Sequence, residues 1–193
     1  MHEVLKVTFV TAVVLAVADV DAESVTAVLN PAGVVVNGES TKEVERKSFA
    51  DGEAIRYRLP DGCRRITGEK TEWTLPVDAR VWFQAGSGTN IDYEGLYTAA
   101  TVHDLPVGQR MAFPMAFKLG DGTYRLLTEA NVVDYTDSCA VYLGNGRFGV
   151  VYYADEDGFD QTGTDVTPWR VLLVANDLQT LATSDIVRRL CPD

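Results

Sequence analysis

The residues of this sequence best suited to chemistry are a few carboxylates set among aromatic side chains. Tyr93, Glu94 and Tyr97 lie close together in the chain, and Glu129 stands inside residues 121–135, a run rich in aromatic and turn residues. Aromatic faces suit the CH faces of a pyranose ring, and carboxylates suit its hydroxyl groups. Tyr93, Glu94 and Tyr97 are therefore candidates for sugar binding, with the alternative that their side chains only fix a loop.

Other patterns that could mark a reactive site fail on residue type or spacing. In the acidic stretch that begins at Asp155, an EF-hand loop would need Gly and Glu where Asp160 and Val166 stand, so a solvated hairpin tip is predicted. None of the three cysteines lies in a C-x-x-C pair, which indicates neither a zinc site nor a disulfide framework. With only His2 and His103, the chain is poorly equipped for a mutarotase, whose sugar site needs histidine beside a carboxylate.

Length and charge limit the classes of protein to consider. The 193 residues suit one domain with a sizeable core, and they are too few for a β-domain joined to a (β/α)₈ barrel, which alone needs ~250 residues. The formal net charge of −11 argues against binding to nucleic acid or to an anionic membrane surface, because both need clustered Lys and Arg. No stretch reaches the ~20 apolar residues of a membrane-spanning helix.

Residues 1–22 support two interpretations. Residues 7–18 are almost wholly apolar, as in a signal peptide, whereas Glu3 spoils the positive start and residues 4–10 are typical of a first β-strand. Cleavage of a signal peptide would place the protein in a secreted or periplasmic setting, and a retained strand would leave it in the cytoplasm. Residues 23–193 are predicted to form the folded domain in either case.

Short apolar segments divided by turns predict an all-β domain. Residues 54–59 alternate strictly, with Ile55, Tyr57 and Leu59 on one face, which is the pattern of a half-buried strand. Many such segments with almost no helix indicate a β-sandwich or barrel. Further strands are predicted at Val25–Leu29, Gly33–Val36, Glu72–Leu75, Arg80–Gln84, Met111–Leu119, Thr123–Thr128, Ala140–Leu143, Arg147–Tyr153 and Arg170–Val174.

Turns and a single helix complete the predicted organisation. Residues 120–122 and 144–146 have the Gly-rich composition of tight hairpin turns. Only residues 184–190 are predicted to be helical, with Ser184 as the N-cap and two arginines near the C-terminus, where the helix dipole favours cations.

Six short pieces, taken in order, resemble the N-terminal β-domain of glycoside hydrolase family 97. The match runs from about Phe49 to the C-terminus, and residues 1–48 match poorly. The order of the pieces carries the resemblance, because each piece alone is short. The pieces are Phe49–Arg58; Glu69–Trp73 with Leu75-Pro76 and Val81–Phe83; Tyr93-Glu94 with Tyr97; Glu129-Ala130 with Asp134-Tyr135; Thr167–Arg170; and Ser184–Val187 with Leu190–Pro192.

This resemblance implies a fold and a role. The fold would be an all-β, galactose mutarotase-like β-super-sandwich, mostly antiparallel, with one short C-terminal helix. The role would be that of a non-catalytic, carbohydrate-associated N-terminal domain in a calcium-dependent α-glucosidase or α-galactosidase, packed on the catalytic barrel. Glu129 would lend one calcium ligand, and the barrel would supply the others, since calcium takes six to eight oxygen ligands. The chain ends about where the barrel would begin, so calcium binding alone is expected to be weak or absent.

Further expectations concern the activity, association and packing of the isolated chain. The alternative to an accessory domain is an autonomous carbohydrate-binding or interaction module that has lost the barrel. An independent hydrolase is disfavoured, because hydrolysis needs two carboxyl groups flanking the scissile bond and the sequence carries no second carboxylate motif. Without a barrel, the face that carries Glu129 is predicted to be apolar and to promote self-association. Trp169 and Arg170 are expected to pack and pair inside the fold.

Overall fold

Strands and tight turns make up most of the chain in the computed structural model. It describes residues 27–41, 43–61, 64–86, 96–132, 137–152, 158–161 and 165–191. The elements are β1 Val28–Asn30, β2 Val34–Val36, β3 Glu39–Thr41, β4 Val44–Phe49, β5 Gly52–Tyr57, β6 Arg64–Glu69, β7 Glu72–Thr74, β8 Arg80–Gly86, β9 Thr98–Thr101, the 3₁₀ turn Val102–Asp104, β10 Arg110–Lys118, β11 Tyr124–Ala130, β12 Ser138–Gly144, β13 Arg147–Tyr152, β14 Phe159–Gln161, β15 Trp169–Ala175, α1 Leu178–Thr183 and α2 Ile186–Leu190.

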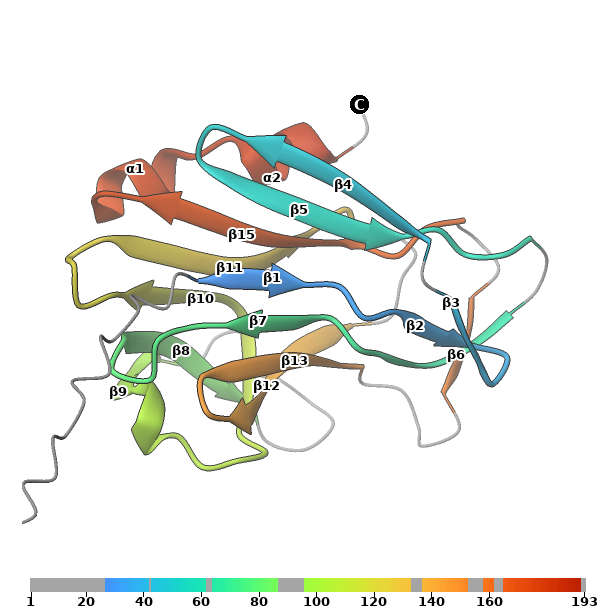
Figure 1. Cartoon of the computed structure of the whole chain (residues 1–193), viewed down its shortest axis with the longest axis horizontal. Helices are drawn as coiled ribbons and strands as arrows, with labels where there is room; N and C mark the ends of the chain where they lie inside the picture. The colour runs from blue at the N-terminus through green and yellow to red at the C-terminus, as the bar shows by residue number, and fades with distance from the viewer. Residues whose placement is uncertain are drawn as a thin grey trace, which may run out of the picture.

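The strands form one large curled sheet and one small sheet, and all their pairings are antiparallel. The large sheet has the order β1-β7-β13-β12-β10-β11-β15-β5-β4, with β8 on the other side of β10 and β9 beside β8. The small sheet has the order β14-β6-β2-β3. Figure 1 shows β2 and β6 continuing from β1 and β7 at one end of the molecule. The predicted all-β, antiparallel sandwich is therefore confirmed.

The large sheet folds back on itself because β10 changes its partner along its length. Its C-terminal half pairs with β11, from Met115 opposite Leu127 onwards, whereas its N-terminal half pairs with β12 through Arg110 and Met111. The strands β11 and β12 therefore diverge from the middle of β10. We call the place where they separate the fork.

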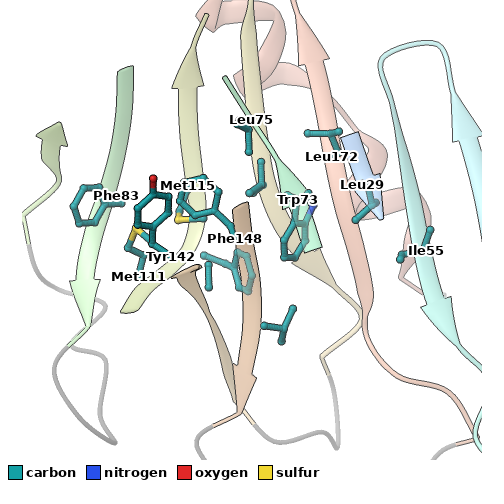
Figure 2. Close-up of a cluster of buried hydrophobic side chains, with 14 of the residues drawn as sticks. Leu29, Ile55, Trp73, Leu75, Phe83, Met111, Met115, Tyr142, Phe148 and Leu172 are labelled. Atoms are coloured by element: carbon teal, nitrogen blue, oxygen red, sulfur yellow. The ribbon is translucent and has the colours of Figure 1, made fainter. Parts of the chain in front are cut away.

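The main hydrophobic core lies between the two layers of the folded sheet. Side chains from β1, β7 and β13 meet side chains from β5, β10 and β15 in this cluster. Figure 2 labels several of them, including Leu29, Trp73, Phe148, Ile55 and Leu172. The rings of Phe117 and Phe148 contact edge to face with centroids 5.3 Å apart. Burial of these apolar groups is the main favourable contribution to the folding of the sandwich.

The outer face of β11, β15 and β5 carries a second cluster, which is covered by the two helices. It contains Trp169, Val171 and Leu173 of β15, together with Leu181 of α1 and Ile186 of α2. Central strand β15 is therefore buried on both faces, which is why it is a nearly continuous apolar run. Figure 1 shows α1 and α2 beside β15 and β5.

The helical end of the chain differs from the prediction in two respects. Asp177, whose carboxylate accepts a hydrogen bond from the Thr180 amide at 2.8 Å, caps α1, which the sequence analysis did not predict. The predicted Ser184 N-cap is wrong, because α2 begins at Ile186 with Asp185 before it. The Ser184 hydroxyl instead donates a hydrogen bond to Asp51 at 2.7 Å, which ties the helices to the turn before β5.

Most predicted strands are present, and the faces of β5 are as expected. Ile55, Tyr57 and Leu59 are all buried. Residues 28–30 form β1, whereas residues 4–10, 25 and 26 lie outside the described residues. Five of the strands were not predicted from the sequence, namely β3, β4, β6, β9 and β14. The described part of the chain contains no helix with the length and apolarity of a membrane span.

The predicted turn at residues 144–146 is tightly built around a glycine. Gly146 has a φ of +75°, and a Cβ atom placed there would lie 2.1 Å from the carbonyl oxygen of Leu75. The same two residues are joined by a hydrogen bond of 2.8 Å from the Leu75 amide to the Gly146 carbonyl. Only a glycine allows this close approach of two backbones.

We expect Gly146→Ala to lower the free energy of unfolding by about 3 kcal/mol, because strain from the left-handed backbone adds to a backbone clash. The matched control is Gly122→Ala, in another turn with a φ of +85° and no atom within 4 Å of the added methyl group. This control should cost only about 1–2 kcal/mol. Urea denaturation of both variants measures the difference, and equal losses would contradict a backbone clash at Gly146.

Candidate functional site

Glu129 lies at the fork, on the inner face of the large sheet. It stands directly opposite Arg170 in the pairing of β11 with β15. On the side away from β15, Glu129 contacts Ser138, the first residue of β12. The Ser138 hydroxyl donates a hydrogen bond of 2.6 Å to Oε2 of Glu129, and Nη1 of Arg170 donates one of 2.5 Å to the same oxygen. The Glu129 side chain keeps 17% exposure.

Arg170 is a fully buried charge that joins the two sheets. Its side chain has 0% exposure, as has that of Glu69 on β6 in the small sheet. Nε of Arg170 donates to Oε1 of Glu69 at 3.0 Å, and Nη2 donates to Oε2 at 2.8 Å. This forked geometry is the strong form of an ion pair, because two parallel hydrogen bonds set both distance and orientation.

The ion pair continues into a chain of buried hydroxyl groups. Glu69 also accepts hydrogen bonds from the hydroxyls of Thr71, at 2.5 Å, and of Tyr152. The Thr71 and Tyr57 hydroxyls are 2.9 Å apart, and the Tyr57 oxygen accepts hydrogen bonds from the amides of residues 32 and 33. We call this set the buried polar network, and its members are Tyr57, Glu69, Thr71, Glu129, Ser138, Tyr152 and Arg170.

Charge pairing determines the protonation states inside the network. Burial by itself raises the pKa of Glu69, but the charge and hydrogen bonds of Arg170, with those of Thr71 and Tyr152, outweigh it and hold that pKa below its usual range. Burial lowers the pKa of Arg170, but Glu69 and the other nearby groups raise it well above its ordinary value. Glu69 and Arg170 are therefore both charged at neutral pH. Burial also raises the pKa of Tyr57, which stays a neutral hydroxyl.

Trp169 and Arg170 point to opposite faces of β15. Trp169 packs in the outer cluster under Lys47 and Arg56, whose charged groups lie 4.9 Å and 4.4 Å from a ring centroid of its indole. Arg56 is in turn held by Glu45 at 2.7 Å. The expectation that Trp169 and Arg170 pack and pair inside the fold is confirmed.

The predicted sugar-binding residues are only partly placed. Tyr93 and Glu94 lie outside the described residues. Tyr97 is 53% exposed, and its hydroxyl lies 3.5 Å from the carbonyl oxygen of Pro114, in the middle of β10. Tyr97 therefore lies beside the part of β10 where the strand changes its partner from β12 to β11. Sugar binding by Tyr93, Glu94 and Tyr97 stays a prediction.

Three residues that hold Glu129 and Arg170 in place were not predicted from the sequence. Ser138, Tyr152 and Glu69 were not singled out, although Glu69 begins one of the pieces that carry the resemblance to family 97. Glu69 is 101 residues from Arg170 in the chain, so no local spacing connects the two. The strand β6 also offers little signal, because Ile66 is its only large apolar residue.

The described residues do not complete a metal site. They contain no group of three or more His, Cys, Asp or Glu placed to hold one ion. Most of the acidic stretch from Asp155 lies outside the described residues. A groove of about 360 Å³ runs along the outer face of the β12–β13 hairpin, and its walls are mainly apolar. Glu129 is a described carboxylate that is anchored on one oxygen and partly exposed.

The ion pair of Glu69 predicts a pH-dependent stability. Because the pKa of Glu69 is lower in the folded chain than in the unfolded chain, its contribution is complete above about pH 4.5 and is lost as the pH falls through the folded pKa. We expect Glu69→Gln to lower the free energy of unfolding by about 3–5 kcal/mol at neutral pH, because it leaves a buried arginine poorly paired. This deficit should narrow as the pH falls below about 4.5.

Urea denaturation over a pH series measures this deficit. The matched control is Glu45→Gln, which breaks the partly exposed pair with Arg56 and should cost no more than about 1 kcal/mol. A Glu69→Gln deficit that stays constant from neutral to acid pH would show that the carboxylate charge contributes nothing to stability.

Comparison with known proteins places this geometry in a family. Residues 19–192 match the family model described as Glycosyl-hydrolase 97 N-terminal. A Streptomyces bingchenggensis (strain BCW-1) protein named "Probable retaining alpha-galactosidase" is 34% identical over 146 residues, which cover 74% of this chain and 21% of that protein. The chain therefore spans about a fifth of this relative.

Solved structures agree with the sequence match. A single-residue variant of a family 97 enzyme from Pseudoalteromonas sp. strain K8 superposes with a TM-score of 0.67 at 28% identity, covering 76% of this chain and 23% of that chain. A structure of a family 97 enzyme from the same strain in complex with acarbose gives a TM-score of 0.64 at 25% identity, with the same coverage of both chains. A β-arabinopyranosidase, with a TM-score of 0.53 at 18% identity, shares the fold alone. The chain thus belongs to glycoside hydrolase family 97, of which it matches the N-terminal domain.

Proposed function

We propose that this chain is the non-catalytic N-terminal domain of a calcium-dependent α-glycoside hydrolase. In this proposal it packs on the catalytic barrel and supplies Glu129 as one calcium ligand. The observation that carries the proposal is the position of Glu129, a partly exposed carboxylate at the fork that is held from behind by Arg170 and Ser138. The family relatives support the setting, since the chain covers only 21% of one and 23% of another.

The donor chemistry at the fork fits calcium. Calcium prefers carboxylate and carbonyl oxygens and takes six to eight of them. Both donors that the described residues supply to the Glu129 carboxylate bind Oε2, so Oε1 is the oxygen left for an ion. One carboxylate oxygen is a small part of such a shell. We therefore place the remaining ligands on the barrel.

The described carboxylates are poorly suited to hydrolysis on their own. Glycoside hydrolysis needs one carboxyl group that can be protonated and a second that acts as nucleophile or base, on opposite sides of the scissile bond. Glu69 is fully buried and has a lowered pKa, so it offers neither access nor a proton at neutral pH. Glu69 and Glu129 both form ion pairs with the guanidinium of Arg170, which leaves no space for a sugar between them.

The relatives indicate the substrate class. One is named as a retaining α-galactosidase, and two solved family 97 structures hold acarbose and panose. We propose an α-linked glycoside as the substrate of the complete enzyme. We also propose that Tyr93, Glu94 and Tyr97 contact the sugar, which is supported by the 53% exposure of Tyr97 beside the Pro114 carbonyl of β10.

The first prediction is that the chain alone does not hydrolyse glycosides. Aryl α-glucosides and α-galactosides, with and without calcium, should release no phenol above the uncatalysed background, because the described residues include no pair of carboxyl groups, one protonated and one ionised, placed to flank a bound sugar. Turnover that follows the chain through purification and needs no partner would contradict the accessory role. Tight oligosaccharide binding by the chain alone would favour an autonomous carbohydrate-binding module.

The second prediction concerns calcium. The isolated chain should bind calcium no tighter than about millimolar, and calcium below that concentration should hardly raise its melting temperature. Combined with a family 97 barrel, the chain should bind more tightly when calcium is added, and Glu129→Gln should remove most of this gain. The control Glu39→Gln makes the same charge change on exposed β3 and should leave the gain intact. A micromolar site in the isolated chain that Glu129→Gln abolishes would contradict a shared site.

A further inference from the structure

We infer that Arg170, Glu69 and Ser138 are positioning residues, which hold Glu129 in one orientation and preserve its negative charge for the cation. This inference rests on the proposed role of Glu129 and deepens it, because it assigns functions to three residues that do not themselves bind the ion.

The first argument is orientation. Ser138 and Arg170 bind the same oxygen of Glu129 from two strands, β12 and β15, that lie on opposite sides of it. The Ser138 hydroxyl is itself oriented by Nη1 of Arg170, at 3.0 Å. Three groups thus form a closed triangle in which each restrains the other two. Such outer hydrogen bonds commonly fix the direction of a metal-binding carboxylate.

The second argument is rigidity of the support. A positioning arginine must itself be immobile, and Arg170 is held by both oxygens of Glu69. Its guanidinium also lies 5.9 Å from the ring centroid of Tyr152, whose hydroxyl binds Glu69. Since both Arg170 and Glu69 have 0% exposure, water does not compete for these bonds. Glu129 is therefore anchored to the packed interior.

The third argument is charge. An arginine in contact with a metal-binding carboxylate would by itself neutralise that carboxylate and repel a cation. Here the buried Glu69 already balances the charge of Arg170. The two carboxylates and the one guanidinium together carry a net charge of −1. The excess charge resides on Glu129, the one member of the three that is exposed. Glu69 thereby lets an arginine orient Glu129 without removing its attraction for a cation.

The test uses the full chain with Tb³⁺, a calcium analogue whose paramagnetism marks the nuclei around it. The main variant is Ser138→Ala, which removes a single hydroxyl from Glu129 and leaves the buried volume almost unchanged. The matched control is Tyr142→Phe, which removes a buried hydroxyl that accepts a hydrogen bond from the Gly146 amide and lies outside the buried polar network. A third variant, Arg170→Lys, keeps the charge but loses the forked geometry.

Two quantities are measured for each variant, the Tb³⁺ affinity from shifts of the amide signals of residues 127–130 and the midpoint of thermal unfolding. We expect Ser138→Ala and Arg170→Lys to weaken Tb³⁺ binding roughly 10-fold, and Tyr142→Phe to leave it unchanged. Unfolding midpoints should fall for all three, since each variant removes a buried hydrogen bond. A purely structural network would lower the midpoints without changing affinity at the fork.

The outcomes separate this inference from the proposed function. If Glu129→Gln leaves Tb³⁺ binding at the fork unchanged, the ligand role of Glu129 is wrong and the inference falls with it. If Glu129→Gln abolishes binding while Ser138→Ala and Arg170→Lys bind like the unmodified chain, only the positioning role is wrong. Should Arg170→Lys fail to fold, Ser138→Ala and its Tyr142→Phe control decide.

Discussion

The buried charge of Arg170 is the constraint on which the rest of this fold depends. A guanidinium with no exposure needs an anion at hydrogen-bond distance, and the described fold supplies Glu69 from the other sheet. This requirement fixes the small sheet against β15 and fixes the register of β15 itself. A slip of one residue would put Trp169 on the inner face and carry Arg170 into the apolar cluster beneath the helices. Hydrophobic burial drives collapse, and this ion pair selects one arrangement of the collapsed sheets.

The fork follows from the same arrangement. Residues 128–130 of β11 continue to pair with β15 after β10 has turned away towards β12. The hydrogen-bonded pairing between neighbouring strands is interrupted at this place, and polar side chains occupy it. Glu129 and Ser138 are the residues that face each other across it, and Arg170 satisfies both from the interior. The place where β10 changes its partner is thus also the place where a carboxylate can be held rigidly and still be partly exposed to solvent.

Local patterns could predict much of the fold and little of the site. The alternation of residues 54–59 and the glycine turn at residues 144–146 depend only on neighbours in sequence, and both were predicted correctly. By contrast, β4 is an edge strand with mostly polar side chains, so it lacks the apolar periodicity that marks a strand. The partners of Arg170 come from strands far apart in the chain, and only tertiary packing brings them together. The resemblance to family 97 could single out Glu129, but no spacing could show what holds it.

The electrostatics of the three charged residues bear on the proposed role of Glu129 as an ion ligand. If Arg170 had Glu129 as its only partner, the pair would be neutral and the fork would have no attraction for a cation. If Glu69 were the only partner, Glu129 would be a flexible surface carboxylate that loses conformational entropy on binding an ion. With both partners present, the charge of Arg170 is balanced by Glu69, which water cannot reach. Nη1 of Arg170 then orients Glu129, which water can reach. A second anion beside an already balanced cation leaves local negative charge in a partly desolvated position, which a bound cation would relieve.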